Sequence, residues 1–429
     1  MRYGRLPFGN LVLALIYLAA LTVWAALVAD TVDLAQQAAA PPSFPTPTVA
    51  PPPQTPSPAP ERPAPRPSAP NSPVLQSVSV EPPSTGGHHP KTGRYIAAWL
   101  PDSFGSVNRQ SFEANADILD EISPFWYSPN SRGGLSFGRE ARDQTLVELA
   151  RSKNVLVIPT IHNVVTGPDP VPGILSNPTT RSRHVQLILD EVLTYGYDGI
   201  DIDYEFLHAS LREEYTAFIF ELADALHAHG KLLTVAVHAK DCDMCGLGGF
   251  QDWAEIGQVV DRLRIMTYDY HWRGGGPGPV APVYWVERVA NYAKTVVDPA
   301  KVVIGVPFYG YNWPNNGSES ARGQTWEMID EIIRVYGLSV NLLERDEHGL
   351  VQENWITYTT RDGTRRTVWF ATSSGLDAKL RLVQNLDLAG IAIWRLGGED
   401  PRSWEVIRNR LVEDPFESQR MLNQLLPEH

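Results

Sequence analysis

The sequence predicts an α/β fold, a closed TIM barrel of the (β/α)8 type, on two observations. Short apolar runs alternate with helix-like segments such as 212–229 and 282–296, which is typical of parallel βαβ units. Eight such runs follow residue 91, and the remaining chain is longer than the about 250 residues that such a barrel needs. The runs are residues 95–100, 122–127, 155–161, 197–204, 232–238, 263–268, 302–308 and 390–394. An open doubly wound sheet is the alternative, but no GxGxxG motif follows the first run.

The pattern of the N-terminal residues predicts a membrane-spanning helix. Residues 11–29 carry no charge, and a helix of that length spans about 28 Å, close to the hydrocarbon thickness of a bilayer. Arg2 and Arg5 precede it, so residues 1–10 are expected in the cytoplasm and the remainder outside. We therefore expect a single-pass membrane protein with an extracytoplasmic domain. The alternative is a cleaved signal peptide, which would leave a secreted protein.

A Pro-rich segment, residues 30–91, separates this helix from the barrel. Residues 41–90 alone hold 18 of the 36 prolines. Such a composition cannot bury enough apolar surface to fold, and we expect a disordered, extended linker. The barrel domain is then expected over 92–415, followed by a short polar tail, 416–429, to which no role is assigned.

The long interval between the seventh and eighth predicted strands indicates an insertion at about 314–374. It contains a helix-like piece, 325–336, and two short β-rich pieces, 355–358 and 367–370. These pieces predict a small α+β unit that walls one side of the barrel's catalytic face.

Composition narrows the classes of function that the chain can have. With 36 Lys and Arg against 49 Asp and Glu, the net charge is −13, so a nucleic-acid partner is not expected. The two cysteines, Cys242 and Cys245, follow the fifth predicted strand, where a local loop disulfide is the simplest interpretation and free thiols are the alternative. We expect a monomer, with neither cofactor nor metal.

The most informative segment is the acidic fourth strand. Side chains alternate faces along a strand, so Asp201, Asp203 and Glu205 share one face and the apolar residues between them take the other. Carboxylates about 6.6 Å apart repel one another, which raises the pKa of some and suits a general acid. Glu205 lies nearest the C-terminal end of the strand, where barrel active sites open. A metal site or a solvated acidic edge is the alternative.

Residues 198–205 resemble the signature of glycoside hydrolase family 18, the chitinase-like barrels. Residues 266–269 (MTYD) resemble the sixth-strand motif of that family, and Trp394 resembles its subsite tryptophan. Segments 268–272, 277–282, 309–311 and 394–397 are most similar to the branch of bacterial spore-cortex-lytic N-acetylglucosaminidases, although no LysM module is seen. The third strand ends in Thr160-Ile161-His162-Asn163, which differs from the Ser/Gly-rich motif of chitinases.

The resemblance implies a substrate-assisted, retaining hydrolysis of an N-acetylated glycan polymer, peptidoglycan or chitin-like. Glu205 would protonate the leaving oxygen and then activate water. Asp203 would orient the acetamido group, Asp201 would share a proton with Asp203, and Tyr268 would hydrogen-bond the acetamido carbonyl. The alternative is a catalytically inactive, lectin-like barrel that binds glycans.

Further residues are expected at the substrate. Trp394 is expected to lie beneath the −1 sugar, and Asp269 to bind a sugar hydroxyl or a loop backbone. The remaining predicted substrate-binding residues stand at strand ends; they are Met266, Tyr127, Trp99 and Asn163.

Overall fold

The computed structural model describes residues 90–91, 93–102, 105–164 and 167–412. The predicted membrane helix 11–29, the linker up to residue 89 and the tail 416–429 lie outside these residues. Among the helices that are described, none is long and apolar enough to cross a membrane.

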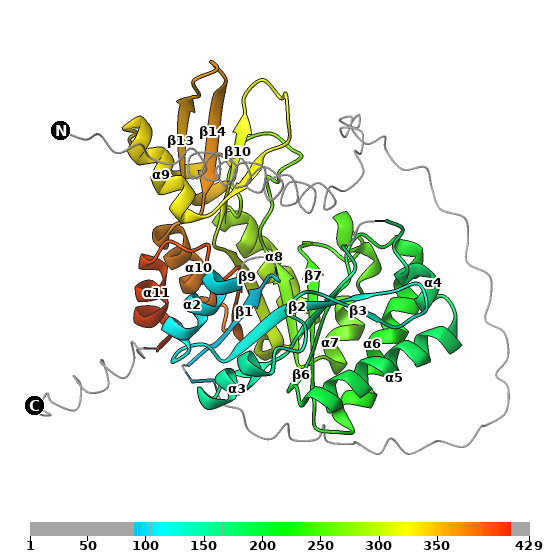
Figure 1. The fold of residues 1–429 in the computed structure, drawn as a ribbon. Coiled ribbons are helices and arrows are strands. Elements are labelled where there is room, and N and C mark those ends of the chain that lie inside the picture. The colour runs from blue at the N-terminus through cyan, green and yellow to red at the C-terminus, as the bar shows by residue number, and fades with distance from the viewer. Residues whose placement is uncertain (1–89, 92, 103–104, 165–166, 413–429) are drawn as a thin grey trace, which may run out of the picture.

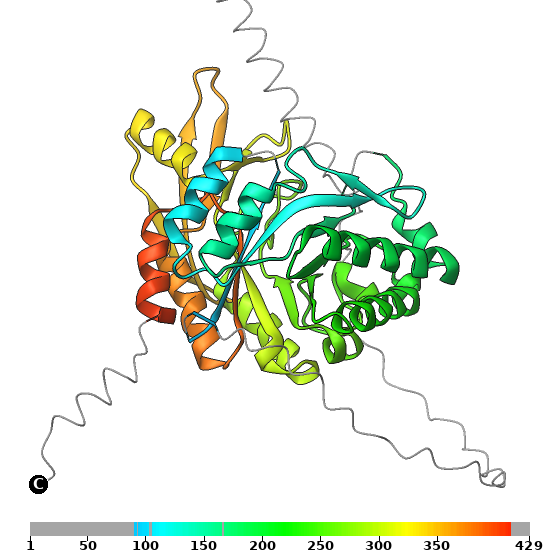
Figure 2. The ribbon, with the colours of Figure 1, turned by 60° about the horizontal axis from the view of Figure 1, so that its bottom comes forward.

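Parallel strands form a closed barrel, as the alternating pattern predicted (Figures 1 and 2). β1 pairs in parallel with both β2 and β15, and this double pairing closes the cylinder. The barrel strands are β1 (Tyr95–Leu100), β2 (Glu121–Pro129), β4 (Leu156–Val157) with β5 (Thr160–His162), β6 (Gly199–Asp203), β7 (Leu232–His238), β8 (Arg262–Met266), β9 (Val302–Pro307) and β15 (Gly390–Trp394). A short strand, β3 (Leu135–Phe137), pairs antiparallel with the end of β2.

The predicted third strand is divided in two. β4 and β5 are separated by Ile158 and Pro159, and Pro159 has no N–H to give to a strand ladder. Its carbonyl still accepts the Asp201 amide at 2.9 Å, so the chain remains beside β6.

Helices surround the barrel on its outer side (Figure 2). α5 shows why such a segment is helical: Asn177 caps its first turn, Pro178 occupies the first position, and Gly196 ends it with a left-handed φ of 68°. The α-helices of this layer are α2 (Gly105–Asn115), α3 (Gln144–Ser152), α4 (Val171–Leu175), α5 (Pro178–Tyr195), α6 (Arg212–His227), α7 (Trp253–Val259), α8 (Val283–Val296), α10 (Ser373–Asn385) and α11 (Arg402–Ile407). Shorter turns are the 3-10 helices Ala209–Leu211, Gly246–Phe250 and Pro299–Lys301 and the π-helix Arg408–Val412.

Two separate clusters of apolar side chains, one outside the strands and one inside the cylinder, stabilise the barrel. The outward strand residues, among them Ile200 and Ile202, are fully buried against the helices. A smaller cluster inside the cylinder includes Trp99, Ala236 and Val303, with Tyr268 and Trp394 packed against it. The interior is therefore mixed aromatic and polar, which suits a site rather than a purely hydrophobic core.

The insertion between β9 and β15 is a five-stranded antiparallel sheet with one helix (Figure 1). It comprises β10 (Gly310–Pro314), β11 (Arg322–Gln324), α9 (Trp326–Tyr336), β12 (Asn341–Asp346), β13 (Gly349–Thr359) and β14 (Arg365–Phe370). It begins at Gly310 rather than at 314, because β10 pairs with β14 and leaves the barrel directly after β9. Ile329 of α9 packs on one face of the sheet against Ile356, Val368 and Phe370.

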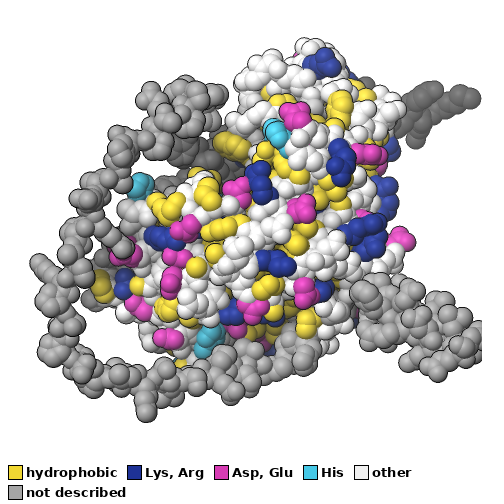
Figure 3. All heavy atoms as spheres, turned by 180° about the vertical axis from the view of Figure 1, so that it is seen from behind, with side chains coloured by type: hydrophobic (Ala, Val, Ile, Leu, Met, Phe, Trp, Pro, Cys, Tyr) yellow, Lys and Arg dark blue, Asp and Glu magenta, His cyan; other side chains and the backbone are white. Residues whose placement is uncertain are grey.

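Two further features concern the loop after β7 and the distribution of charge on the surface. Cys242 and Cys245 form a disulfide in the loop after β7, as the simpler interpretation expected. On the face in Figure 3, acidic and basic side chains are interspersed and no broad basic surface is visible.

Candidate active site

Asp201 lies wholly buried inside the barrel, at the centre of a hydrogen-bond network. Its carboxylate accepts from Thr160 Oγ1 at 2.9 Å, from Thr234 Oγ1 at 2.7 Å and from Trp99 Nε1 at 2.9 Å. Burial raises its pKa, and the three donors oppose that rise. Asp201 is thus held in one orientation by strands on both sides.

Strand register explains this network. Thr160 of β5 and Thr234 of β7 are the direct cross-strand partners of Asp201 on β6. Residues paired in this way point to the same face of a sheet, so two threonine hydroxyls reach the carboxylate from either side.

Asp203, two residues further, faces the same interior and is 5% exposed. Its Oδ1 atom is buried without a hydrogen-bond partner in the part of the chain that is described. Burial raises its pKa well above the usual value, and the charges of Glu205 and Asp201 raise it further. A buried polar atom without a partner is costly, and a ligand N–H would satisfy it.

Glu205 follows the end of β6, and its side chain is 19% exposed. Burial, and next the charge of Asp269, raise the pKa of Glu205 to about 7. Its backbone is clamped by Asn163, whose Oδ1 accepts the Glu205 amide at 2.7 Å and whose Nδ2 donates to the Glu205 carbonyl at 2.9 Å. Glu205 therefore combines solvent access with a carboxyl that is still partly protonated at neutral pH.

Tyr268 lies beyond β8 and packs into the interior cluster. Burial raises its pKa, and the charges of Asp203 and Glu205 raise it further, which places the phenol in their field. Gly305 of β9 makes room for the ring, because a Cβ there would lie 2.7 Å from Tyr268 Cε1. The structure therefore brings Tyr268 together with the three carboxylates.

Trp394 ends β15 and is partly exposed. Its ring meets Trp99 edge-on at 6.0 Å and Phe125 at 5.0 Å. Its peptide bond to Arg395 is cis. Trp99 itself is 1% exposed, so it supports Trp394 and Asp201 and offers no open surface to a ligand.

Two residues at the end of β8 border the same region. Asp269 accepts hydrogen bonds from the hydroxyls of Tyr309 and Tyr311, the latter at 3.0 Å. Burial raises the pKa of Asp269 to about 6, and these two bonds oppose the rise. Met266 is partly buried and pairs across the strands with His238.

Tyr127 does not join the site, so its predicted place in the cleft is wrong. Its hydroxyl contacts Glu191 of α5 at 2.9 Å and Tyr197 at 2.7 Å, on the helix side of the barrel. The reason is an irregularity in β2: Phe125 pairs with Thr160, but Tyr127 pairs with Ile161. One extra residue reverses the alternation, so Phe125 faces the interior and Tyr127 faces outward.

Sequence reasoning missed several residues of the site. Arg264 of β8 is wholly buried, forms an ion pair with Glu121, and lies 3.4 Å from Asp201. Burial lowers the pKa of Arg264 to about 10, so it stays charged at neutral pH. His238, at the end of β7, places Nδ1 3.9 Å from Glu205 Oε2. Residues 262–266 are RLRIM, so the available signal for Arg264 was a pair of arginines on the same face of a barrel strand.

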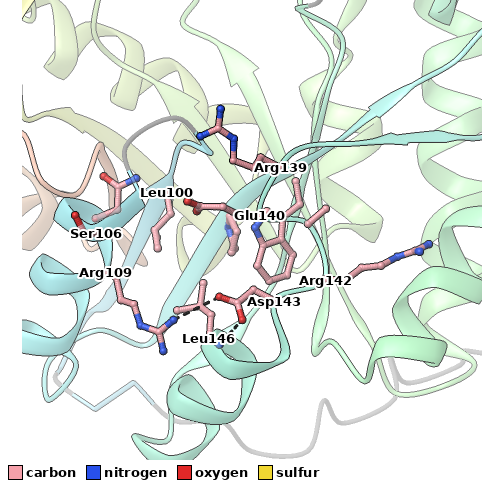
Figure 4. Close-up of a pocket in the computed structure, with 12 residues that line it drawn as sticks. Leu100, Ser106, Arg109, Arg139, Glu140, Arg142, Asp143 and Leu146 are labelled. Carbon is pink, nitrogen blue, oxygen red and sulfur yellow. Dashed lines mark hydrogen bonds and ion pairs between the residues drawn. The ribbon is translucent and has the colours of Figure 1, made fainter. Parts of the chain in front are cut away.

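A separate hollow lies outside the barrel, between α2, β2 and α3, and has a volume of about 490 Å³ (Figure 4). None of the predicted site residues lines it. Arg109 is engaged by Asp143 at 3.4 Å, and Arg142 points away to bind Glu191 at 2.7 Å. Among the described residues, no group of His, Cys, Asp or Glu side chains is arranged to hold a metal ion.

Comparison with known proteins identifies relatives. The family model described as glycosyl hydrolases family 18 matches residues 149–399. YdhD of Bacillus subtilis (strain 168), named as a proposed sporulation-specific glycosylase, is 31% identical over 73% of this chain and 76% of that protein. The cortical fragment-lytic enzyme of the same organism is 26% identical over 70% of each chain. The crystal structure of the Bacillus cereus spore cortex-lytic enzyme SleL matches with a TM-score of 0.68 at 23% identity and 74% coverage of each chain, which establishes the shared fold.

Proposed function

Because the chain belongs to glycosyl hydrolase family 18 and is a glycosidase, we propose that it hydrolyses β-1,4 bonds of N-acetylglucosamine-containing glycans with retention of configuration. The observation that carries this proposal is the set of Asp201, Asp203 and Glu205 inside a closed barrel, beside Tyr268. In this proposal the substrate supplies its own nucleophile.

The first step breaks the glycosidic bond. The acetamido oxygen of the −1 sugar attacks C1, the bond from C1 to the leaving oxygen breaks, and Glu205 gives its proton to that oxygen. A pKa of about 7 supports this role, because the carboxyl is partly protonated at neutral pH and can both give and take up a proton there. The product is a cyclic oxazolinium intermediate.

The second step uses water. The Glu205 carboxylate removes a proton from a water molecule, the water oxygen attacks C1, and the acetamido oxygen leaves C1. Two inversions at C1 give net retention. The same side chain thus acts first as an acid and then as a base.

The neighbouring residues position the acetamido group. The unpartnered Oδ1 of Asp203 supports a role in accepting its N–H and in stabilising the positive charge of the intermediate. Asp201 orients Asp203 and shares its proton, and Tyr268 donates to the acetamido carbonyl. Trp394 would lie beneath the sugar ring. Asp269 would bind a sugar hydroxyl.

Peptidoglycan is the substrate that we propose. The names of the relatives, which include cortical fragment-lytic enzymes, favour a wall polymer over chitin. A lectin-like barrel without activity is the second candidate, and the presence of Glu205 with a raised pKa argues against it.

The test is digestion of purified peptidoglycan and of chitooligosaccharides by the full chain, with the new reducing ends identified by mass spectrometry. We expect N-acetylglucosamine reducing ends from peptidoglycan and no turnover by Glu205→Gln. Glu255→Gln, an exposed change on α7, is the matched control and should retain full activity. Undiminished turnover by Glu205→Gln would refute the assignment, and cleavage of chitooligosaccharides alone would refute the substrate.

We also propose that the domain works as a monomer outside the cytoplasm, tethered through residues 11–29. The Cys242–Cys245 disulfide supports an oxidising compartment. Membrane fractionation with mass spectrometry of the mature N-terminus would distinguish an anchored chain from a secreted one. Light scattering of the purified full chain would test its oligomeric state.

A further inference from the structure

His238 stands at the C-terminal end of β7, next to the proposed acid on β6. Its Nδ1 atom lies 3.9 Å from Glu205 Oε2, and the His238 side chain is 9% exposed. The ring is fixed on two sides: it packs against Phe206 at 5.1 Å and against Phe250 at 6.3 Å. Its backbone amide donates to Gln251 Oε1 at 2.9 Å. The imidazole is therefore held at this place.

A backbone hydrogen bond determines the tautomer of the ring. The Phe206 amide donates to His238 Nε2 at 3.2 Å, so Nε2 must be the acceptor and carry no proton. In a neutral imidazole the proton then lies on Nδ1, the atom that faces Glu205. Burial lowers the pKa of His238 to about 4, which keeps the ring neutral at physiological pH.

The charged and titratable groups around this pair come from several elements. Asp203 of β6, and Tyr268 and Asp269 after β8, act on Glu205 or lie in its field. On the other side of His238, Tyr215 of α6 packs against Phe250. In the loop after β7, Lys240 donates to three backbone carbonyls, those of Asp243, Gly248 and Gln251.

We propose that His238 is a positioning residue that donates its Nδ1–H to the carboxylate of Glu205 once the acid has released its proton. This inference rests on the proposed role of Glu205. While Glu205 is protonated, the 3.9 Å between His238 Nδ1 and Glu205 Oε2 is too long for a hydrogen bond. As the proton passes to the leaving oxygen, negative charge develops on Glu205. A small side-chain rotation then brings His238 Nδ1 and the Glu205 carboxylate within hydrogen-bond distance. A donor that binds the charged form lowers the energy of that form.

His238 is not a second acid or base in this scheme. Its Nδ1 proton stays on the ring throughout, and its Nε2 lone pair is engaged by the Phe206 amide. It acts only by stabilising and orienting a carboxylate.

Two variants test the proposal in the full chain. His238→Leu keeps the volume and removes the donor, whereas His238→Asn can place an N–H near the Nδ1 position. For His238→Leu we expect the alkaline limb of the kcat/KM profile on peptidoglycan fragments to move up by about half a pH unit or more, because the ionised acid loses its donor. We expect kcat to fall about tenfold to a hundredfold. His238→Asn should return the limb toward that of the parent.

Thermal unfolding of each variant separates a folding defect from a local effect. A folded His238→Leu variant with an unmoved alkaline limb would overturn the proposal, and so would a His238→Asn variant that behaves like Leu. These results differ from a failure of the proposed function, which would appear as an active Glu205→Gln enzyme whatever residue stands at 238.

A direct measurement on the parent protein does not depend on any variant folding well. Long-range ¹H–¹⁵N spectra of histidine-labelled protein report which ring nitrogen carries the proton. We expect the His238 resonances to show an Nδ1–H tautomer that persists through mildly acidic pH. A proton on Nε2 would contradict the proposal.

Discussion

Asn163 and Glu205 are joined by two reciprocal hydrogen bonds between the third and fourth barrel strands. The Asn163 side-chain oxygen accepts the Glu205 amide at 2.7 Å, and its amide group donates to the Glu205 carbonyl at 2.9 Å. This amide fixes the backbone of the proposed acid just after β6 ends, where the strand ladder no longer holds it. Asn163, which the sequence predicted to contact the substrate, thus supports the backbone of Glu205, the residue that we propose acts on the substrate.

Asn163→Ala should lower kcat by about tenfold to a hundredfold, because small misplacements of a catalytic group are costly. Initial rates on peptidoglycan fragments provide the measurement. Asn385→Ala, an exposed change at the end of α10, should leave the rate unchanged. Equal rates for the parent and Asn163→Ala would show that the clamp has no catalytic role.

The pH dependence of activity follows from the raised pKa of Glu205. A general acid must be protonated, and with a pKa of about 7 the acid is lost as the pH rises through that value. The kcat/KM profile should therefore decline above about pH 7.

Asp269→Asn should move this decline to lower pH. The change removes a negative charge that raises the pKa of Glu205, while the asparagine oxygen can still accept from Tyr311. Comparing the two pH profiles measures the displacement. A displacement to higher pH would contradict the electrostatic coupling between the two carboxyls.

Asp203→Asn should raise stability and reduce activity together. The folded-state pKa of Asp203 lies well above its unfolded value, so folding favours the neutral acid. Its contribution to stability is full at pH below the unfolded pKa and is lost as pH rises toward the folded pKa. Near neutral pH the uncharged amide should therefore be more stable, by about 1–2 kcal/mol, as at other functional sites.

Thermal unfolding in mildly acidic and mildly alkaline buffers provides the measurement for Asp203→Asn. The gain in Tm should be larger in the alkaline buffer, because the parent carboxyl must take up a proton on folding and the free-energy cost of that uptake rises with pH. A variant that is less stable than the parent in both buffers would contradict this account.

The barrel interior also contains an ion pair, and its removal should strongly destabilise the fold. Arg264 and Glu121 are both fully buried, and Arg264 further donates to Ser123 Oγ at 2.8 Å. Glu121→Gln removes the nearer carboxylate of a buried guanidinium, which then keeps only Asp201 at 3.4 Å, and should cost about 3–5 kcal/mol in the free energy of unfolding. Denaturant unfolding measures this quantity.

The exposed ion pair between Glu331 and Arg334 of α9 is the matched control. Glu331→Gln should cost less than about 1 kcal/mol, because solvent screens the pair. Similar costs for the two changes would mean that Arg264 is compensated by other groups.

Local patterns in the sequence were sufficient for much of the fold. Alternation along 199–203 placed Asp201 and Asp203 on the interior face, and the interval before the eighth strand indicated the insertion. Both rest on properties of short segments, since strand periodicity and chain length do not depend on distant contacts. The same is true of the disulfide, whose two cysteines are three residues apart.

Tertiary structure alone decided which residues meet. Thr160 and Thr234 became partners of Asp201 through cross-strand register, and register is set when distant strands pair. The irregularity in β2 turned Tyr127 outward, and one extra residue in a strand leaves no mark in a hydrophobic pattern. His238 and Asn163 lie beside Glu205 because the strands that they follow or end, β7 and β5, pair with β6 on either side. The sequence alone determined which residue types line the barrel, and the closing of the cylinder decided their neighbours, because contacts between residues far apart in the chain depend on the whole fold.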